Sequence, residues 1–389
     1  MEPVTDGVPD SAQDVRRYLD GGSSEPLDPA ARQALLTTYD AVREAGYADP
    51  LRLHSPARQA RLLLDNARAA VAEAFGVRPD EVTFTASGTA AVHLGVLGLL
   101  RGRVRVSRTL AVSAVEHSAV FAAARWWEEY GGAATQVLPV DPTGRLVLPL
   151  ALDAEPAVVA VQQANPEVGA VQPVREVAAA LPGVPLFVDA CATAGLLPLP
   201  DGWSAAALSA HKWGGPAGVG VLLVRKGARW RPPFPTDDRV DPRTSGFENV
   251  PAALAAAAAL QSRVAAREAL VRRHEELAAR LRAALVAIPD VEVHGHRDER
   301  LPHLVSFSCL YVDGEALVTE LDRRGFAVAS GSACTASALE PSHVLVAMGA
   351  LTHGNARVTF TPTTTTEDVD ALAAVLPEVV DELRRRVDR

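Results

Sequence analysis

The chain has 389 residues, enough for about two domains that bury a core without disulfides or a structural metal. Hydrophobic residues make up 48% and charged residues 22%, which excludes disorder for the bulk of the chain. A net charge of −9 without a basic stripe argues against nucleic-acid binding. No stretch reaches the ~18 apolar residues of a membrane span. Three cysteines and a polar N-terminus predict a cytoplasmic protein without a signal peptide.

In chain order, residues 1–16 show no apolar period and predict a flexible tail. Apolar spacing predicts helices over 61–75 and 90–100, on either side of a short strand at 82–84. Strand-like runs then alternate with helical patterns. The expected strands are 104–106, 110–114, 135–138, 157–161, 185–188, 206–208 and 219–224, and the expected helices between them include 118–130 and 174–181. This alternation predicts βαβ units and a mostly parallel sheet covered on both faces.

The pattern changes in the last 160 residues or so. Residues 232–251 predict an extended loop, and 251–288 a long helix with a solvated face at Glu268, Arg272, Glu275 and Arg280. An α+β unit follows, with strands at 291–293, 304–308 and 326–329 and helices at 314–324 and 366–387. We therefore expect a tail over 1–16, a large domain over 17–255 and a small C-terminal domain over 256–389.

The sharpest local motif surrounds Lys212, which follows a short apolar strand and precedes a glycine-rich turn. A partly desolvated amine in such a place can bind an aldehyde covalently. Ser209 and His211 flank the lysine and can donate hydrogen bonds to a phosphate. On this motif alone, a surface lysine on a turn is an equal alternative.

Three further motifs place polar residues after apolar strands. Asp189 ends one strand, and pyridoxal phosphate (PLP) needs such an acid at its pyridine nitrogen. Gly88 and Thr89 open a helix whose backbone N–H groups can face an anion. His117 follows another strand and can stack on a planar cofactor. An ordinary loop aspartate, a plain helix cap at Ser87 or Thr89, and a loop histidine are the alternatives.

The order of these motifs, a phosphate turn, a histidine, an aspartate and a lysine, resembles that of the class V aminotransferases of PLP fold type I. The resemblance runs from residue 18 to the C-terminus and is closest to cysteine desulfurases of the nitrogen-fixation-type first group. Residues 329–342 are similar to the nucleophile loop of that group and contain Cys334. Asn355-Ala356-Arg357 matches the arginine that binds the substrate α-carboxylate, and residues 164–172 support the same alignment.

The resemblance implies an α/β fold, with a large PLP-binding domain around a mostly parallel, seven-stranded-type sheet and a small α+β domain. It implies that Lys212 carries PLP and that Arg357 binds the substrate carboxylate. Cys334 would take sulfur from L-cysteine, leaving L-alanine, and pass it as a persulfide to an acceptor protein. The cofactor-binding set would be Gly88, Thr89, His117, Asn165, Asp189, Ser209, His211 and Lys212, with His117 also moving protons and Asn165 also touching the substrate. The resemblance also implies a homodimer. No metal site is expected.

The cysteines fit this interpretation on chemical grounds. A sulfur-accepting thiolate needs an exposed loop, and small residues surround Cys334. Cys309 lies in an apolar run, so we expect it to be a buried hydrophobe. Cys191 is expected to pack near the site without acting.

Three positions depart from the family's pattern. Ala192 stands where a glutamine contacts the PLP phenolic oxygen, and Pro166 replaces the second asparagine of an Asn-Asn-Glu motif. Phe247 follows Gly246 where a threonine is usual, and Arg243 is one residue out of register. Two alternatives therefore stay open. One is another class V reaction, such as transamination, epimerisation or selenocysteine lysis, and the other is a PLP-fold protein without catalysis.

Overall fold

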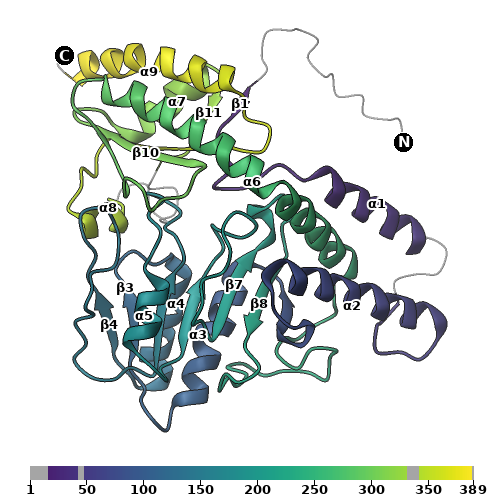
Figure 1. Cartoon of the computed structure of the whole chain (residues 1–389). Helices are drawn as coiled ribbons and strands as arrows, with labels where there is room; N and C mark the ends of the chain where they lie inside the picture. Colours follow the sequence, from purple (N-terminus) through teal and green to yellow (C-terminus); the bar gives the residue numbers. More distant parts are fainter. Residues whose placement is uncertain (1–15, 43–47, 331–340, 388–389) are drawn as a thin grey trace.

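The computed structural model describes residues 16–42, 48–330 and 341–387. A seven-stranded sheet forms the centre of the large domain (Figure 1). Its strand order is β2-β8-β7-β6-β5-β3-β4. Only β8 runs antiparallel to its neighbours, which confirms the expected mostly parallel sheet. The strands are β2 (Val82–Thr85), β3 (Leu110–Ser113), β4 (Thr135–Leu138), β5 (Val158–Gln162), β6 (Leu186–Asp189), β7 (Ala205–Ser209) and β8 (Gly220–Val224).

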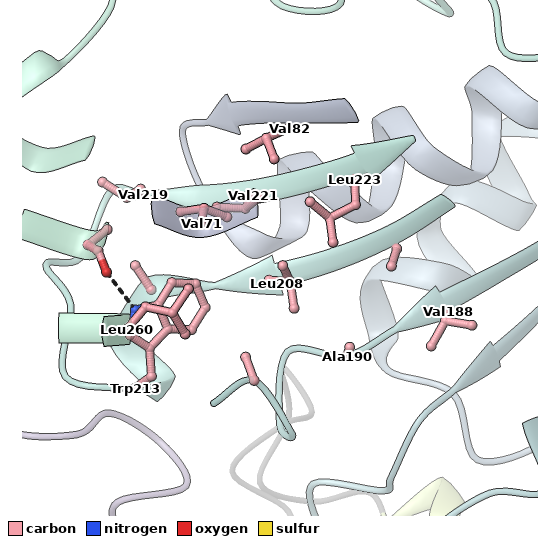
Figure 2. Close-up of a cluster of buried hydrophobic side chains, with 14 of the residues drawn as sticks. Val71, Val82, Val188, Ala190, Leu208, Trp213, Val219, Val221, Leu223 and Leu260 are labelled. Carbon is pink, nitrogen blue, oxygen red and sulfur yellow. Dashed lines mark hydrogen bonds between the residues drawn. The ribbon is translucent and has the colours of Figure 1, made fainter. Parts of the chain in front are cut away.

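Helices cover both faces of this sheet, so its inner strands are buried throughout. On one face, α3 (Gly88–Arg103) packs on β7 and β8, with α4 (Ser118–Gly131) beside it. On the other, α1 (Pro29–Val42) and α2 (Ser55–Phe75) pack against α6 (Val250–Val286). Figure 2 shows part of the apolar core between these helices and the sheet. There the Trp213 indole N–H donates to the Ala256 carbonyl at 3.0 Å. The short helix η1 (Pro79–Glu81) connects α2 to β2, while α5 (Val174–Ala180) lies between β5 and β6 and η2 (Ala210–Lys212) between β7 and β8.

The small domain lies at the top of Figure 1. Its antiparallel sheet has the order β12-β10-β9, and a parallel pair joins β1 to β11. The elements are β1 (Arg17–Tyr18), β9 (Val291–Val293), β10 (Leu304–Cys309), α7 (Gly314–Arg323), β11 (Phe326–Ala327), α8 (His343–Met348), β12 (Asn355–Thr359) and α9 (Thr366–Val387). Helix α6 links the domains, since Leu260 packs in the first core and Leu277 in the second. The expected boundary at 255/256 falls inside this helix and stays a prediction.

The expected elements differ from the observed ones at a few places. The strand predicted at 104–106 is wrong, because α3 runs through Arg103 and Val104 keeps helical dihedral angles. The strand predicted over 326–329 ends at Ala327. Helix α1, the six-residue α8 and strand β12 were not predicted. The solvated face expected on α6 is observed, and Cys309 is buried as expected.

Two kinds of feature are not found within the described ranges. None of the helices there is long and apolar enough to cross a membrane. No cluster of three or more His, Cys, Asp or Glu side chains in the same ranges is placed to hold a metal ion.

Residues 19–28, here called the N-terminal strap, tie the two domains together. The Leu19 N–H donates to Ala327 in the small domain, and the Asp28 N–H donates to Gly214 in the large domain, both at 2.8 Å. Between them, the carboxylate of Glu25 forms a buried ion pair with Arg263 of α6. Burial lowers the pKa of Arg263 to about 10, so the guanidinium stays charged at neutral pH and depends on Glu25 for compensation.

We expect Glu25→Ala to destabilise the fold by about 3–5 kcal/mol, because it leaves a buried guanidinium without its counter-ion. Urea unfolding measures the loss. The matched control is Asp370→Ala, which breaks the exposed ion pair of Arg280 and should move the unfolding midpoint little. Equal losses in the two variants would contradict this role of the strap.

Candidate active site

A cavity of about 150 Å³ opens where β5, β6 and β7 end. The carboxyl ends of parallel strands meet at one edge of a sheet, where ligands of open α/β folds bind. Loops after each strand therefore bring residues that are distant in sequence into one lining. The expected site residues found there are Gly88, Thr89, His117, Asp189, Ser209, His211 and Lys212.

The turn before α3 brings a helix N-terminus close to β7. Ser87 caps the helix, its hydroxyl accepting from the Ala90 N–H at 3.0 Å. A Cβ on Gly88 would lie 2.7 Å from the Cβ of Ser209 and 3.1 Å from the Sγ of Cys191. Only a glycine lets the two elements approach so closely. The N–H groups at the start of a helix have no partners within the helix, so this helix end can accept an anion.

Asp189 ends β6 and is buried against Cys191, whose N–H donates to its Oδ1 at 3.0 Å. Burial, with the charge of Asp189, raises the pKa of the Cys191 thiol well above its usual range. Cys191 therefore stays protonated at neutral pH. It lines the cavity, and its thiol is unsuited to nucleophilic attack.

His117 caps α4, with its Nδ1 accepting from the Ala119 N–H at 3.1 Å. Burial lowers the pKa of His117, although the nearby Asp189 acts in the opposite direction. The ring is therefore neutral at physiological pH and carries its proton on Nε2.

Lys212 lies in η2, immediately after β7, and its Nζ donates to the carbonyl of Gly22 in the N-terminal strap. In the same turn, the hydroxyl of Ser209 lies 3.1 Å from Nδ1 of His211. Burial and the charge of Lys212 lower the pKa of His211, so this imidazole is also neutral at physiological pH.

Arg357 lies on β12, outside the cavity lining, and is 2% exposed. Its Nη1 donates to the Pro166 carbonyl at 3.1 Å, and its Nη2 donates to Asp20 at 3.2 Å and to Ser23 at 2.9 Å. Its Nε is buried and has no partner among the described residues. The Arg357 backbone pairs with Ala329, which precedes the segment 331–340 in the sequence. Cys334 belongs to that segment and lies outside the described residues.

Asn165 does not line the cavity. Its Oδ1 accepts from the N–H groups of Glu167 and Val168, both at 2.8 Å, and its Nδ2 donates to Val115 at 3.0 Å. The side chain thus shapes the turn after β5. The contact predicted for it with cofactor and substrate stays a prediction.

The departures noted in the sequence have structural counterparts. Pro166 and Ala192 line the cavity and offer no side-chain hydrogen bond there. Arg243 donates to the Asp80 carbonyl of its own chain at 3.1 Å. Phe247 is half-exposed, with the guanidinium of Arg239 over its ring at 5.1 Å.

Several residues around the site were not found from the sequence. The strap residues that hold Arg357 and Lys212 lie far away in the chain, so no local pattern places them there. Gln162 lines the cavity, but in the sequence it only follows the apolar run that predicted a strand over 157–161. Glu167 is buried near Arg357, and burial raises its pKa to about 7, although a hydrogen bond with Ser342 and the charge of Arg357 oppose the shift.

Comparison with known proteins places this geometry in a family. The model of the class V aminotransferase family matches residues 17–372. An IscS-like cysteine desulfurase of Mycobacterium tuberculosis is 36% identical over 386 residues, covering 95% of this chain and 97% of that protein. The cysteine desulfurase IscS of Dictyoglomus turgidum is 31% identical over 379 residues, covering 94% of this chain and 95% of that protein.

Solved structures show the same architecture. A NifS-like protein superposes with a TM-score of 0.85 at 27% identity, covering 95% of this chain and 100% of that one. The apo structure of a cysteine desulfurase from Thermococcus onnurineus has a TM-score of 0.82 at 21% identity, covering 95% of each chain, and bears on the fold alone. With a lysine, an aspartate and a phosphate-type turn around one cavity, the chain belongs to the class V aminotransferase family, which uses PLP.

Proposed function

We propose that the protein is a PLP-dependent cysteine desulfurase. The observation that carries the proposal is the meeting of Lys212, Asp189, His117 and the Gly88 turn in one cavity. Arg357 of the small domain donates to Pro166 in the cavity wall, and its backbone pairs with Ala329. The cysteine desulfurases named above, at 31–36% identity over almost the whole chain, support this choice of reaction.

The residues of the cavity fit PLP. A Cβ at Gly88 would fill the space between α3 and β7, as expected where a backbone cradles a phosphate. Ser209, His211 and Asp189 line the same cavity, and Asp189 would pair with the pyridine nitrogen. Lys212 supplies the amine for the aldehyde. When bound, PLP supplies the electron sink that stabilises negative charge at the substrate Cα.

The residues of this chain would divide the remaining work. Arg357 binds the substrate carboxylate, the geometry for which guanidinium is best suited. Lys212 moves the proton at Cα, a role that needs an amine close to the reacting carbon. Asp189 would hold the proton of the pyridine nitrogen, and the neutral His117, which lines the same cavity, would contact the cofactor.

Cys334 would accept the sulfur atom of the substrate. Its thiolate attacks the sulfur of L-cysteine, so that an S–S bond forms while the Cβ–S bond breaks. The balance is one L-cysteine and one protein thiol giving one L-alanine and one protein persulfide. An acceptor protein then takes the terminal sulfur.

The roles of Cys334 and Lys212 separate in two variants. Cys334→Ser should lose persulfide and sulfide formation from L-cysteine by at least about 100-fold, because a hydroxyl is a far poorer nucleophile than a thiolate, while still binding PLP. Lys212→Ala should lose the product and also the cofactor that borohydride reduction fixes to the protein. Peptide mapping and alanine assays measure both. Full sulfide release by Cys334→Ser would favour another class V reaction. A wild-type protein that binds PLP but does not react with L-cysteine would favour a protein without catalysis.

Gly88→Ala should weaken PLP binding by at least about tenfold, because the added Cβ would overlap Ser209 and push α3 away from β7. Titration of the apo-protein with PLP, followed by absorbance, measures the change. Gly76→Ala is the control for a glycine with open space around its Cβ position, although its left-handed backbone makes a stability correction necessary. Unchanged PLP affinity in Gly88→Ala would count against the phosphate cradle.

We also propose a homodimer. Large hydrophobic side chains are exposed on α1, α2 and the turn before α2: Leu36, Tyr39, Leu53 and Leu62. Such a concentration is typical of an interface, and the loop 232–249 is expected to reach the neighbouring subunit. Sedimentation should give twice the mass of the chain, and Leu62→Glu should shift it towards monomer. A fully active monomeric wild type would refute this assembly.

A further inference from the structure

Glu116 is a buried acid to which the proposed reaction gives no role. It precedes His117 in the turn after β3 and is 0% exposed. Its Oε1 accepts from the backbone N–H of Gln162 at 2.8 Å. Its Oε2 is buried and has no hydrogen-bond partner among the described residues. A buried acceptor without a donor is costly and calls for an explanation.

The neighbouring Gln162 has the complementary defect. Its Nε2 donates to the Val115 carbonyl at 2.6 Å, while its Oε1 is buried and equally without a partner within the described ranges. Gln162 lines the cavity and stands opposite Asp189 in the pairing of β5 with β6. Two buried oxygens on two hydrogen-bonded residues thus both lack a donor. One proton between them would satisfy both.

The surroundings favour that proton. Burial raises the pKa of Glu116 well above its usual range, and the charge of Asp189 on β6 adds to the effect, opposed by the Gln162 N–H. The other titratable groups at this turn are His117 itself and His343 of α8, whose Nε2 lies 3.0 Å from the Glu116 carbonyl. Burial keeps His117 neutral at physiological pH.

We propose that Glu116 is a positioning residue held as a neutral carboxylic acid, with its Oε2 proton donated to Oε1 of Gln162. Together with the bonds of Gln162 and Asn165 to Val115, this proton fixes the turn that carries His117 against the end of β5. A neutral Glu116 also leaves Asp189 without a second negative charge beside it. The expected effect of Glu116 on PLP binding, through the position of His117, rests on the proposed function. The protonation of Glu116 does not depend on that function.

Infrared difference spectroscopy of the apo-protein at about pH 7 tests the proton directly. Glu116→Gln should lose the carbonyl-stretch band of a protonated carboxylic acid. Glu81→Gln is the matched control, since Glu81 is also buried but both of its oxygens accept, from the backbone N–H groups of Lys226 at 2.8 Å and Arg78 at 3.0 Å. It should lose a carboxylate band instead. Loss of a carboxylate band in Glu116→Gln would overturn the proposal.

The pH dependence of unfolding gives a second readout. An unfolded glutamate titrates at about pH 4.3. Because folded Glu116 keeps its proton to a higher pH, its stabilising contribution to folding is fully present below about pH 4.3. As the pH rises above that value, the folding equilibrium constant falls by about tenfold per pH unit until the pKa of Glu116 in the folded state is passed. Glu116→Gln removes the effect, so its stability relative to wild type should rise between about pH 5 and pH 8. A constant difference over that range would contradict the neutral acid.

Gln162→Leu keeps the test open if Glu116→Gln does not fold. Removing the acceptor should move the Glu116 carbonyl band to the higher frequency of a free acid, and an unshifted band would refute the bond to Gln162. With PLP, Glu116→Gln should keep the cofactor affinity within about threefold, and Glu116→Ala should weaken it about tenfold. An equal loss in both would overturn the positioning role. The apo-protein measurements succeed or fail independently of turnover with L-cysteine.

Discussion

The close approach of α3 to β7 is the constraint on which the site depends. Gly88 permits it, because any side chain there would meet Ser209 within 2.7 Å. The approach sets a helix N-terminus and its free N–H groups beside the strand that leads to Lys212. Asp189 ends the next strand of the sheet. A helix N-terminus, an amine and a carboxylate are therefore held at the ends of helices and strands.

The second constraint is the joint between the domains. Arg357 of the small domain donates to the carbonyl of Pro166 in the cavity wall, and the N-terminal strap holds its guanidinium through Asp20 and Ser23. The same strap accepts from Lys212 at Gly22 and is anchored by the Glu25–Arg263 pair. Both cations of the site thus share one support, so a change in the strap should affect substrate binding and cofactor attachment together.

The sequence predicted what local patterns encode. Lys212, Asp189, His117 and Gly88 each stand at the junction of a strand with a turn or helix, so apolar runs located them and the alternation of elements predicted the sheet. Contacts between distant segments left no such pattern. Asp20 and Arg357 are 337 residues apart, and Glu116 and Gln162 are 46 apart. The strand wrongly expected at 104–106 shows the converse, since these three residues, although they alternate apolar and polar side chains, form the turn that ends α3.

In the proposed reaction, one sulfur atom passes from L-cysteine to Cys334. The direct measurement is the mass of the Cys334 peptide after a single turnover of the PLP-loaded protein, with alanine quantified in the same sample. We expect the Cys334 peptide to be heavier by one sulfur atom. We also expect one free alanine to be formed for each persulfide. Alanine or pyruvate formed with an unmodified Cys334 peptide, and with sulfide released directly, would contradict it.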